Sequence, residues 1–297
     1  MLAIVVPYYK SYFFEETLKS LAIQTDNRFH VYIGDDASDE SPEELLKKYE
    51  DQFAFTYHRF QYNLGGMSLV KQWERCLEMI KDEVWVQILG DDDVLSANTV
   101  SMFYEHLGIV DQEDSNVIRF ATQVINEKGA LTSGVYKHPV LESSEEFLIR
   151  KYKGGTRSSL SEYIFRKEKI DAIKFKDFPL AWSSDTLGII EFSENKAIYT
   201  INDTLVFFRR SDKNITGQVD SVEKNEAWFR FYLYVLSNYG KTYSEELVTM
   251  LFDRIEKAQL NNKKTPLRWV KLFWLYLIFK KYSRFFSLRI KIKNSIK

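Results

Sequence analysis

The sequence predicts an α/β protein with a mostly parallel central sheet flanked by helices. In the first half of the chain, short apolar runs alternate with segments whose apolar residues recur every three or four positions. This alternation is typical of parallel strands that helices connect and cover on both faces. Composition agrees, because 45% hydrophobic residues in a chain of 297 provide ample core material.

The expected elements follow one another in a regular order. Apolar runs predict strands at residues 2–6, 30–34, 54–59, 84–89 and 116–125. Helical periodicity between the first four strands predicts helices at residues 13–23, 42–49 and 66–80. Beyond residue 125 the pattern loosens, and helical periodicity resumes at residues 220–238 and 244–259.

Residue usage excludes several classes of protein. The single cysteine, Cys76, excludes an intramolecular disulfide and a multi-cysteine metal site, and it fits a reducing compartment. The four histidines include no pair at metal-ligand spacing, which argues against zinc. The first residues lack the pattern of a signal peptide. The apolar stretch at 269–279 is interrupted by Lys271 and is too short to span a bilayer.

Charge is distributed unevenly along the chain. Residues 257–297 contain 12 Lys/Arg and no Asp/Glu, so the net charge of −1 leaves about −13 on the rest. We predict that the aromatic, basic segment 263–297 is an amphipathic tail lying on a membrane surface. The alternative is a helix that packs on the main domain with solvated lysines. The acidic remainder of the chain argues against nucleic acid as a partner.

Polar clusters directly follow three of the expected strands, where ligands bind in sheets of this type. The most acidic cluster is Asp91, Asp92 and Asp93, which follows the strand at 84–89. Three adjacent carboxylates repel one another unless a cation or hydrogen-bond donors compensate. Mg²⁺ and Mn²⁺ take oxygen ligands, commonly one or two carboxylates plus substrate phosphates. The alternative is an acidic turn that caps the next helix.

The other clusters fit a nucleotide. Asp36, next to Asp35 after the second strand, can accept hydrogen bonds from a base or a ribose, although Ser38 and Asp39 are equally consistent with a helix cap. The aromatic residues of segment 7–9 can offer a ring face to a base; the alternative is that they pack in the hydrophobic core. Glycines in the segment 63–66 permit a tight turn and close backbone approach.

Together these motifs resemble, in order and spacing, glycosyltransferase family 2, which comprises inverting transferases with the GT-A nucleotide-diphospho-sugar-binding fold. The resemblance extends over residues 2–217, and it implies a catalytic domain at 1–217, a helical extension at 218–262 and the tail at 263–297. The matching segments are residues 4–9, 35–39, 63–66, 89–95, 184–185, 208–210 and 214–216. Two positions depart from the family pattern, since Gly90 and Ser184 stand where the family has acidic residues.

The resemblance implies a role for individual residues. Asp185 would be the catalytic base, and Asp92 or Asp93 would bind Mg²⁺ or Mn²⁺. Arg209, Arg210 and Lys213 would hold the diphosphate. The residues implied to bind the nucleotide sugar are Pro7, Tyr9, Asp36, Asn63, Gly65, Asp91, Asp92, Arg209 and Arg210.

The predicted function is inverting transfer of a sugar from a nucleotide diphosphate donor, by family tendency a UDP-sugar, to a glycan or lipid-linked acceptor. The resemblance implies cell-surface polysaccharide synthesis at the cytoplasmic face of the membrane. One alternative is a sugar-phosphate nucleotidyltransferase, although residues 7–10 are not the Gly-rich signature of that class. The other is a nucleotide-sugar-binding protein without catalysis.

Overall fold

The computed structural model describes residues 1–212, 221–262 and 265–294. The chain divides into two compact units. We call Met1–Asp177 with Asp185–Gln218 the sheet unit, and Phe178–Ser184 with Val219–Lys297 the helical unit.

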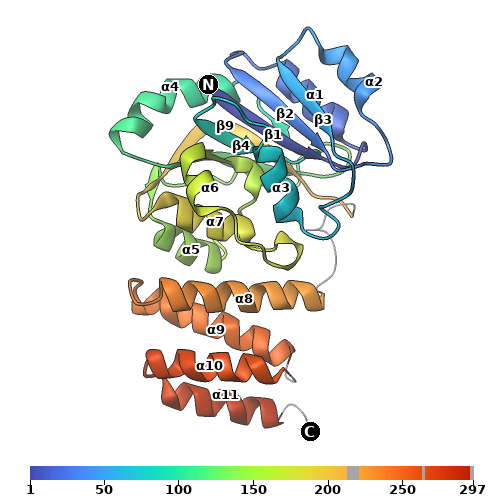
Figure 1. The fold of residues 1–297 in the computed structure, drawn as a ribbon. Helices are drawn as coiled ribbons and strands as arrows, with labels where there is room; N and C mark the ends of the chain where they lie inside the picture. Colours follow the sequence, from blue (N-terminus) through green and yellow to red (C-terminus); the bar gives the residue numbers. More distant parts are fainter. Residues whose placement is uncertain (213–220, 263–264, 295–297) are drawn as a thin grey trace. The chain divides into compact units, whose positions relative to one another are not determined.

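The sheet unit contains a mixed sheet of nine strands among the described residues, in the order β3-β2-β1-β4-β8-β6-β9-β5, with β7 also paired to β9 (Figure 1). Parallel pairing joins β3, β2, β1 and β4, and also β6 and β9. The remaining pairs are antiparallel: β8 runs in the opposite direction between β4 and β6, and β5 and β7 each pair antiparallel with β9. The strands are Leu2–Tyr8 (β1), Phe29–Asp35 (β2), Phe55–Arg59 (β3), Trp85–Ile88 (β4), Val94–Leu95 (β5), Val117–Ile125 (β6), Leu141–Glu142 (β7), Tyr163–Arg166 (β8) and Ile198–Arg209 (β9).

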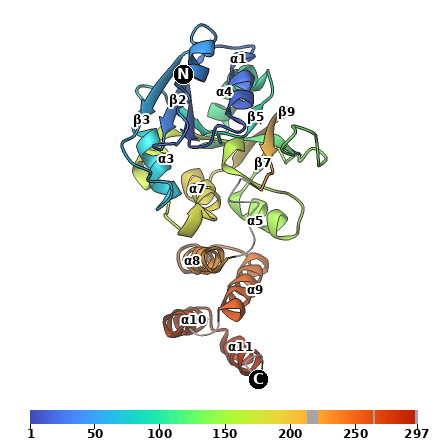
Figure 2. The ribbon, with the colours of Figure 1, turned by 90° about the vertical axis from the view of Figure 1, so that its right-hand side faces the viewer.

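Helices flank this sheet, which confirms the predicted α/β class (Figures 1 and 2). Short 3-10 helices lie at Lys47–Tyr49 (η1), Leu160–Glu162 (η2) and Pro179–Ala181 (η3). The α-helices around the sheet are Phe14–Ala22 (α1), Glu43–Leu46 (α2), Leu69–Leu77 (α3), Thr99–Gln112 (α4), Ser144–Tyr152 (α5), Lys167–Ile173 (α6) and Ser184–Ser193 (α7).

Alternation along the buried strands explains how the two faces of the sheet are covered. In β1, Leu2, Ile4 and Val6 join the same apolar cluster as side chains of α1 and α4. Helix α3 contacts the sheet at β1 and β2, and its Cys76 is fully buried. The buried strand β1 therefore ends between two covered faces, and the segment that follows it is held in place by the core.

The helical unit consists of α8 (Val222–Asn238), α9 (Glu245–Asn261), α10 (Pro266–Ile278) and α11 (Tyr282–Asn294), together with η3. The segment that we predicted as the tail contains two helices, α10 and α11, separated by a turn in which Lys280 has a positive φ of 54°. The tail packs on the preceding helices through Arg268, which is 3% exposed and pairs with Glu226 at 2.5 Å. Among the described residues, no helix is long and apolar enough to cross a membrane.

Candidate active site

The site forms where β1 and β4 end side by side, since these strands pair in parallel. Asp91 joins the two ends: its Oδ2 accepts hydrogen bonds from the backbone N–H groups of Tyr9 and Lys10, both at 3.0 Å. Pro7 is the half-buried penultimate residue of β1, and Tyr9 just beyond it is 41% exposed. The structure thus brings the clusters at 7–10 and 90–93 together and leaves an aromatic face beside them.

Asp93 organises the inner side of the cluster and is 3% exposed. Its Oδ1 accepts a hydrogen bond from the backbone N–H of Arg209 at 2.8 Å, and its Oδ2 accepts one from the hydroxyl of Ser161 at 2.5 Å. Burial raises the pKa of Asp93, and these two hydrogen bonds oppose that shift. Asp93 therefore ties the loop after β4 to the end of β9 and to η2.

Asp92 differs from both neighbours. It is half-buried, and its carboxylate accepts a hydrogen bond from its own backbone N–H but from no other described residue. Burial raises its pKa well above the ordinary value, with further contributions from the neighbouring carboxylates of Asp93 and Asp91. A carboxylate that is poorly solvated, close to like charges and without a donor from another residue is a group that a cation would stabilise.

The carboxylates fit a hard divalent cation in chemistry, because oxygen atoms are the ligands that Mg²⁺ and Mn²⁺ prefer. Among the described residues, no three His, Cys, Asp or Glu side chains are arranged to hold a metal by themselves. One or two carboxylates from this cluster, led by Asp92, would therefore need substrate oxygens to complete the coordination.

Asp36 faces inward at the end of β2 and is 3% exposed. Its two oxygens accept hydrogen bonds from the backbone N–H groups of Leu64 at 2.7 Å and Gly65 at 2.9 Å, and it pairs with Arg75. A Cβ at Gly65 would lie 2.6 Å from Asp36 Oδ2, so this close approach requires glycine. Asn63 closes the turn, because its Oδ1 accepts a hydrogen bond from the N–H of Gly66.

Arg209 requires a correction. Its side chain is fully buried; the guanidinium donates to the backbone oxygens of Asp92 and Asn126 and pairs with Glu16 at 2.6 Å. Because these internal partners enclose it, Arg209 positions the acidic loop instead of contacting a diphosphate as we predicted. The next residue, Arg210, is exposed. Lys213 and the predicted motif at 214–216 lie outside the described residues.

Comparison with known proteins identifies the family. A model described as glycosyl transferase family 2 matches residues 3–167, more than half of the chain. The chain belongs to glycosyltransferase family 2. The matched region contains the clusters at 7–10, 35–39, 63–66 and 90–93, whereas Asp185 and Arg210 lie beyond it.

Solved structures support the fold of this family member. A crystal structure of S. aureus TarS residues 1–349 in complex with UDP-GlcNAc has a TM-score of 0.65 and 18% identity, over 88% of this chain and 73% of that one. A complex of the same protein with UDP has a TM-score of 0.61 and 20% identity, over 87% and 71%. At these identities the similarity shows the fold alone, and it agrees with the predicted GT-A architecture.

A match to a curated relative covers a smaller part of the chain than the matches to the solved structures do. An uncharacterized glycosyltransferase of Mycoplasma genitalium is 29% identical over 109 residues, which are 35% of this chain and 36% of that protein. The chain therefore matches about a third of the length of this relative.

Asp185 occupies the first turn of α7 and is half-buried. Its Oδ1 accepts a hydrogen bond of 3.4 Å from Thr186, whose hydroxyl in turn accepts one from Lys151 at 2.9 Å. None of the contacts among the described residues joins Asp185 to the cluster at 91–93. Its role as a base is therefore a prediction that rests on the resemblance.

Several residues of the site have no motif that the sequence could reveal. Ser161 accepts a hydrogen bond from the N–H of Gly90 at 3.0 Å while it donates to Asp93, and Thr17 donates to the backbone oxygen of Asp93 at 2.9 Å. A serine before a short strand and a threonine inside a helix are both ordinary in sequence. Only their placement beside the acidic loop distinguishes them.

Replacing Ser161 by alanine is expected to loosen the acidic loop. The variant loses the donor to buried Asp93 and the acceptor for Gly90, and unsatisfied buried groups cost about 1–3 kcal/mol each. We expect kcat/KM for the sugar donor to fall roughly 10- to 100-fold. Ser158→Ala is the matched control, since that hydroxyl contacts Tyr163 at 3.0 Å and no aspartate. Equal effects of both substitutions on donor kinetics would contradict the role of Ser161.

Proposed function

We propose that this family 2 member is an inverting glycosyltransferase that uses a nucleotide-diphospho-sugar donor and a divalent cation. The observation that carries the proposal is Asp92, a half-buried carboxylate to which no other described residue donates a hydrogen bond and whose pKa is strongly raised. It lies where the carboxyl ends of β1 and β4 meet, which is where sheets of this type bind nucleotides.

The donor is proposed to be a UDP-sugar. S. aureus TarS, which shares the fold, has been crystallised with UDP-GlcNAc and with UDP. In this chain, Pro7 and the exposed ring of Tyr9 would contact the base, and the turn held by Asp36 would line the nucleoside. Arg210, exposed at the end of β9, would reach the diphosphate as a charge-assisted donor.

The cation is proposed to be Mg²⁺ or Mn²⁺. Asp92 would hold it together with an oxygen of Asp91 or Asp93 and with the donor diphosphate. When bound, such a cation neutralises charge on the departing nucleoside diphosphate. Arg209 and Ser161 keep the acidic loop in position, so that the Asp92 carboxylate remains directed at the ligand.

Asp185 is proposed as the general base. It would take the proton of an acceptor hydroxyl while that oxygen attacks the anomeric carbon. The bond between the anomeric carbon and the diphosphate oxygen breaks on the opposite side, and the nucleoside diphosphate leaves with the bonding electrons. A single displacement inverts the anomeric configuration. The positioning of both reactants supplies much of the rate.

The acceptor is proposed to be a glycan or a lipid-linked sugar, in cell-surface polysaccharide synthesis at the cytoplasmic face of the membrane. The assignment to glycosyltransferase family 2 argues against a sugar-phosphate nucleotidyltransferase. The alternative of a nucleotide-sugar-binding protein without catalysis is tested by measuring turnover, because such a protein would bind the donor and transfer no sugar.

A donor panel tests this function. The protein is incubated with UDP-, GDP- and TDP-sugars and Mn²⁺ or Mg²⁺, with and without excess chelator. The measurement is the amount of nucleoside diphosphate released as the sugar passes to an acceptor or to water. We expect release from a UDP-sugar that stops when the chelator is added. Release that persists at full rate with chelator would contradict the cation, and tight UDP binding without release from any donor would contradict catalysis.

A further inference from the structure

Each of the two tail helices has two distinct apolar faces. The inner face of α10 contains Leu272, Leu275 and Tyr276, all at most 1% exposed, and the inner face of α11 contains Leu288 and Ile292. These residues pack within the helical unit, where Tyr276 donates a 2.5 Å hydrogen bond to Glu256. One side of each tail helix is thus buried within the helical unit, and Tyr276 joins α10 to α9.

The outer faces are apolar as well and remain uncovered. On α10 an outer stripe recurs at spacings of three and four residues, and on α11 at spacings of four, so each stripe lies along one side of its helix. Every member is between 51% and 62% exposed. The members are Leu267, Val270, Trp274 and Ile278 on α10, and Tyr282, Phe286 and Ile290 on α11.

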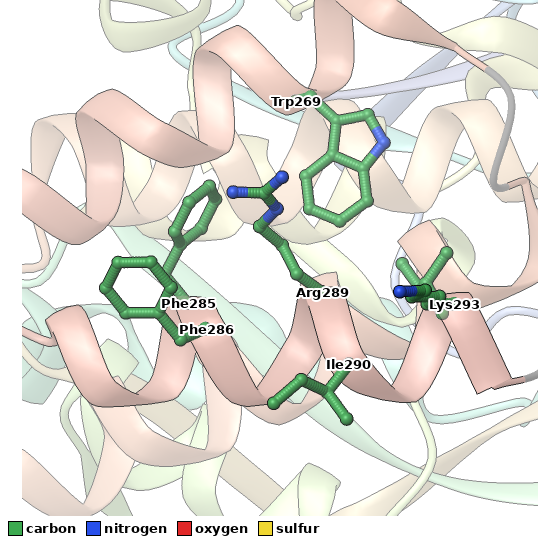
Figure 3. A pocket seen from close by; sticks show the side chains of 7 residues that line it. Trp269, Phe285, Phe286, Arg289, Ile290 and Lys293 are labelled. Carbon is green, nitrogen blue, oxygen red and sulfur yellow. The ribbon is translucent and has the colours of Figure 1, made fainter.

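Between the two helices lies a groove of about 700 Å³. In Figure 3, Trp269 reaches into it from α10, and Phe285 and Arg289 reach into it from α11. The lining is predominantly apolar, and Arg289 and Lys293 are its two cationic members. This combination suits an acyl chain against the rings and a phosphate beside the two cations.

The cations of the tail fall into two sets. Arg268, Lys281 and Arg284 pair with carboxylates of α8 and α9. A second set is exposed and has no carboxylate partner among the described residues, and residues 257–297 contain no acidic side chain. The members of this second set are Lys271, Lys280, Arg289, Lys291 and Lys293.

We propose that the outer faces of α10 and α11 bind the surface of an anionic lipid bilayer, with the stripes at the depth of the headgroups and the unpaired cations against lipid phosphates. Exposed Trp, Phe and Ile beside Lys and Arg are the composition of an interfacial helix. A second copy of this chain fits less well, because a twofold interface would place the same cations against each other. This inference does not depend on the proposed glycosyl transfer.

Sedimentation with vesicles tests the proposal on the full chain. Vesicles of phosphatidylcholine mixed equally with phosphatidylglycerol are compared with vesicles of phosphatidylcholine alone. We expect the protein to pellet with the mixed vesicles and to be released by salt, since screening shortens the reach of charge from about 10 Å at 0.1 M to about 3 Å at 1 M. Failure to pellet with the anionic vesicles, or equal pelleting with both kinds, would overturn the proposal.

Two variants locate the surface. Lys271→Glu/Lys291→Glu/Lys293→Glu is expected to weaken binding roughly 100-fold or more, because each cation near the surface contributes about a factor of five. The matched control, Lys48→Glu/Lys128→Glu/Lys137→Glu, makes the same charge change at exposed lysines of the sheet unit and should bind as the wild type does. Equal weakening by both triples would overturn the assignment to the tail.

The apolar stripes have a separate test. Trp274→Ser/Phe286→Ser should reduce vesicle binding at every ionic strength and leave the molar mass in solution, measured by light scattering, unchanged. If the wild type is instead a dimer that this double variant dissociates, the stripes form a contact between copies and the bilayer assignment is wrong.

Discussion

Asp185→Asn is expected to lower kcat by about 10²–10⁴-fold, which is the range that general acid–base catalysis contributes. Asparagine keeps the size of the side chain and its place in the first turn of α7, but it cannot accept a proton from an acceptor hydroxyl. Donor binding should be unchanged, because Asp185 is assigned to the acceptor. Steady-state transfer rates and the Kd of UDP, measured by calorimetry, check the two statements separately.

A control substitution removes a carboxylate elsewhere in the sheet unit. Asp171 lies on α6 and forms an exposed pair with Lys167, so Asp171→Asn should leave kcat within a factor of two or three. If Asp185→Asn retained full activity, Asp185 would not be the base. Loss of UDP binding along with activity would instead assign Asp185 to the donor.

The first half of the fold is predictable because three of its strands, β1, β2 and β4, are buried on both faces. Apolar runs at 2–6, 30–34, 54–59 and 84–89 stand out against amphipathic helices, and the structure places strands β1 to β4 within a few residues of them. The longest strand, β9, has no such signal, since Asn202 and Asp203 interrupt its apolar residues. There the pairing with β6 skips residues 202–204, so tertiary structure accommodates what the pattern disfavours.

The neighbouring positions of the acidic and aromatic clusters were also predictable, because parallel strands end at one edge of the sheet. The sequence could not predict which of the three carboxylates is available for a ligand. Asp91, Asp92 and Asp93 are equivalent in sequence, and they differ only through contacts with Tyr9, Ser161 and the backbone of Arg209. Those partners come from distant segments, and no spacing rule relates them to the triplet.

The burial of Arg209 was not predictable from the sequence either. An Arg pair after a strand favours anion binding, and the sequence cannot distinguish a buried arginine from an exposed one. Glu16, 193 residues earlier in the chain, supplies the counterion that allows Arg209 to be fully buried. The Glu16 side chain is 46% exposed, so only the arginine end of the pair is buried; without Glu16 the buried guanidinium would lose its carboxylate partner and keep the backbone oxygens of Asp92 and Asn126.

Asp92→Asn is expected to lower transfer on the order of 1,000-fold or more, because charge stabilisation by a divalent cation at such a site is worth several kcal/mol. The amide nearly matches the carboxylate in shape and removes the charge that a cation requires. Stability should not fall, since no other described residue donates a hydrogen bond to the Asp92 carboxylate and the carboxylates of Asp91 and Asp93 repel its charge. Asp39→Asn, at an exposed aspartate after β2, is the control.

The position of a bound cation tests the central claim most directly. Crystals of the wild-type protein grown with UDP and Mn²⁺ should show an anomalous manganese peak between the Asp92 carboxylate and the diphosphate, and the peak should be absent in Asp92→Asn. UDP bound at the ends of β1 and β4 with no manganese beside Asp92, or manganese bound elsewhere in the chain, would contradict the account.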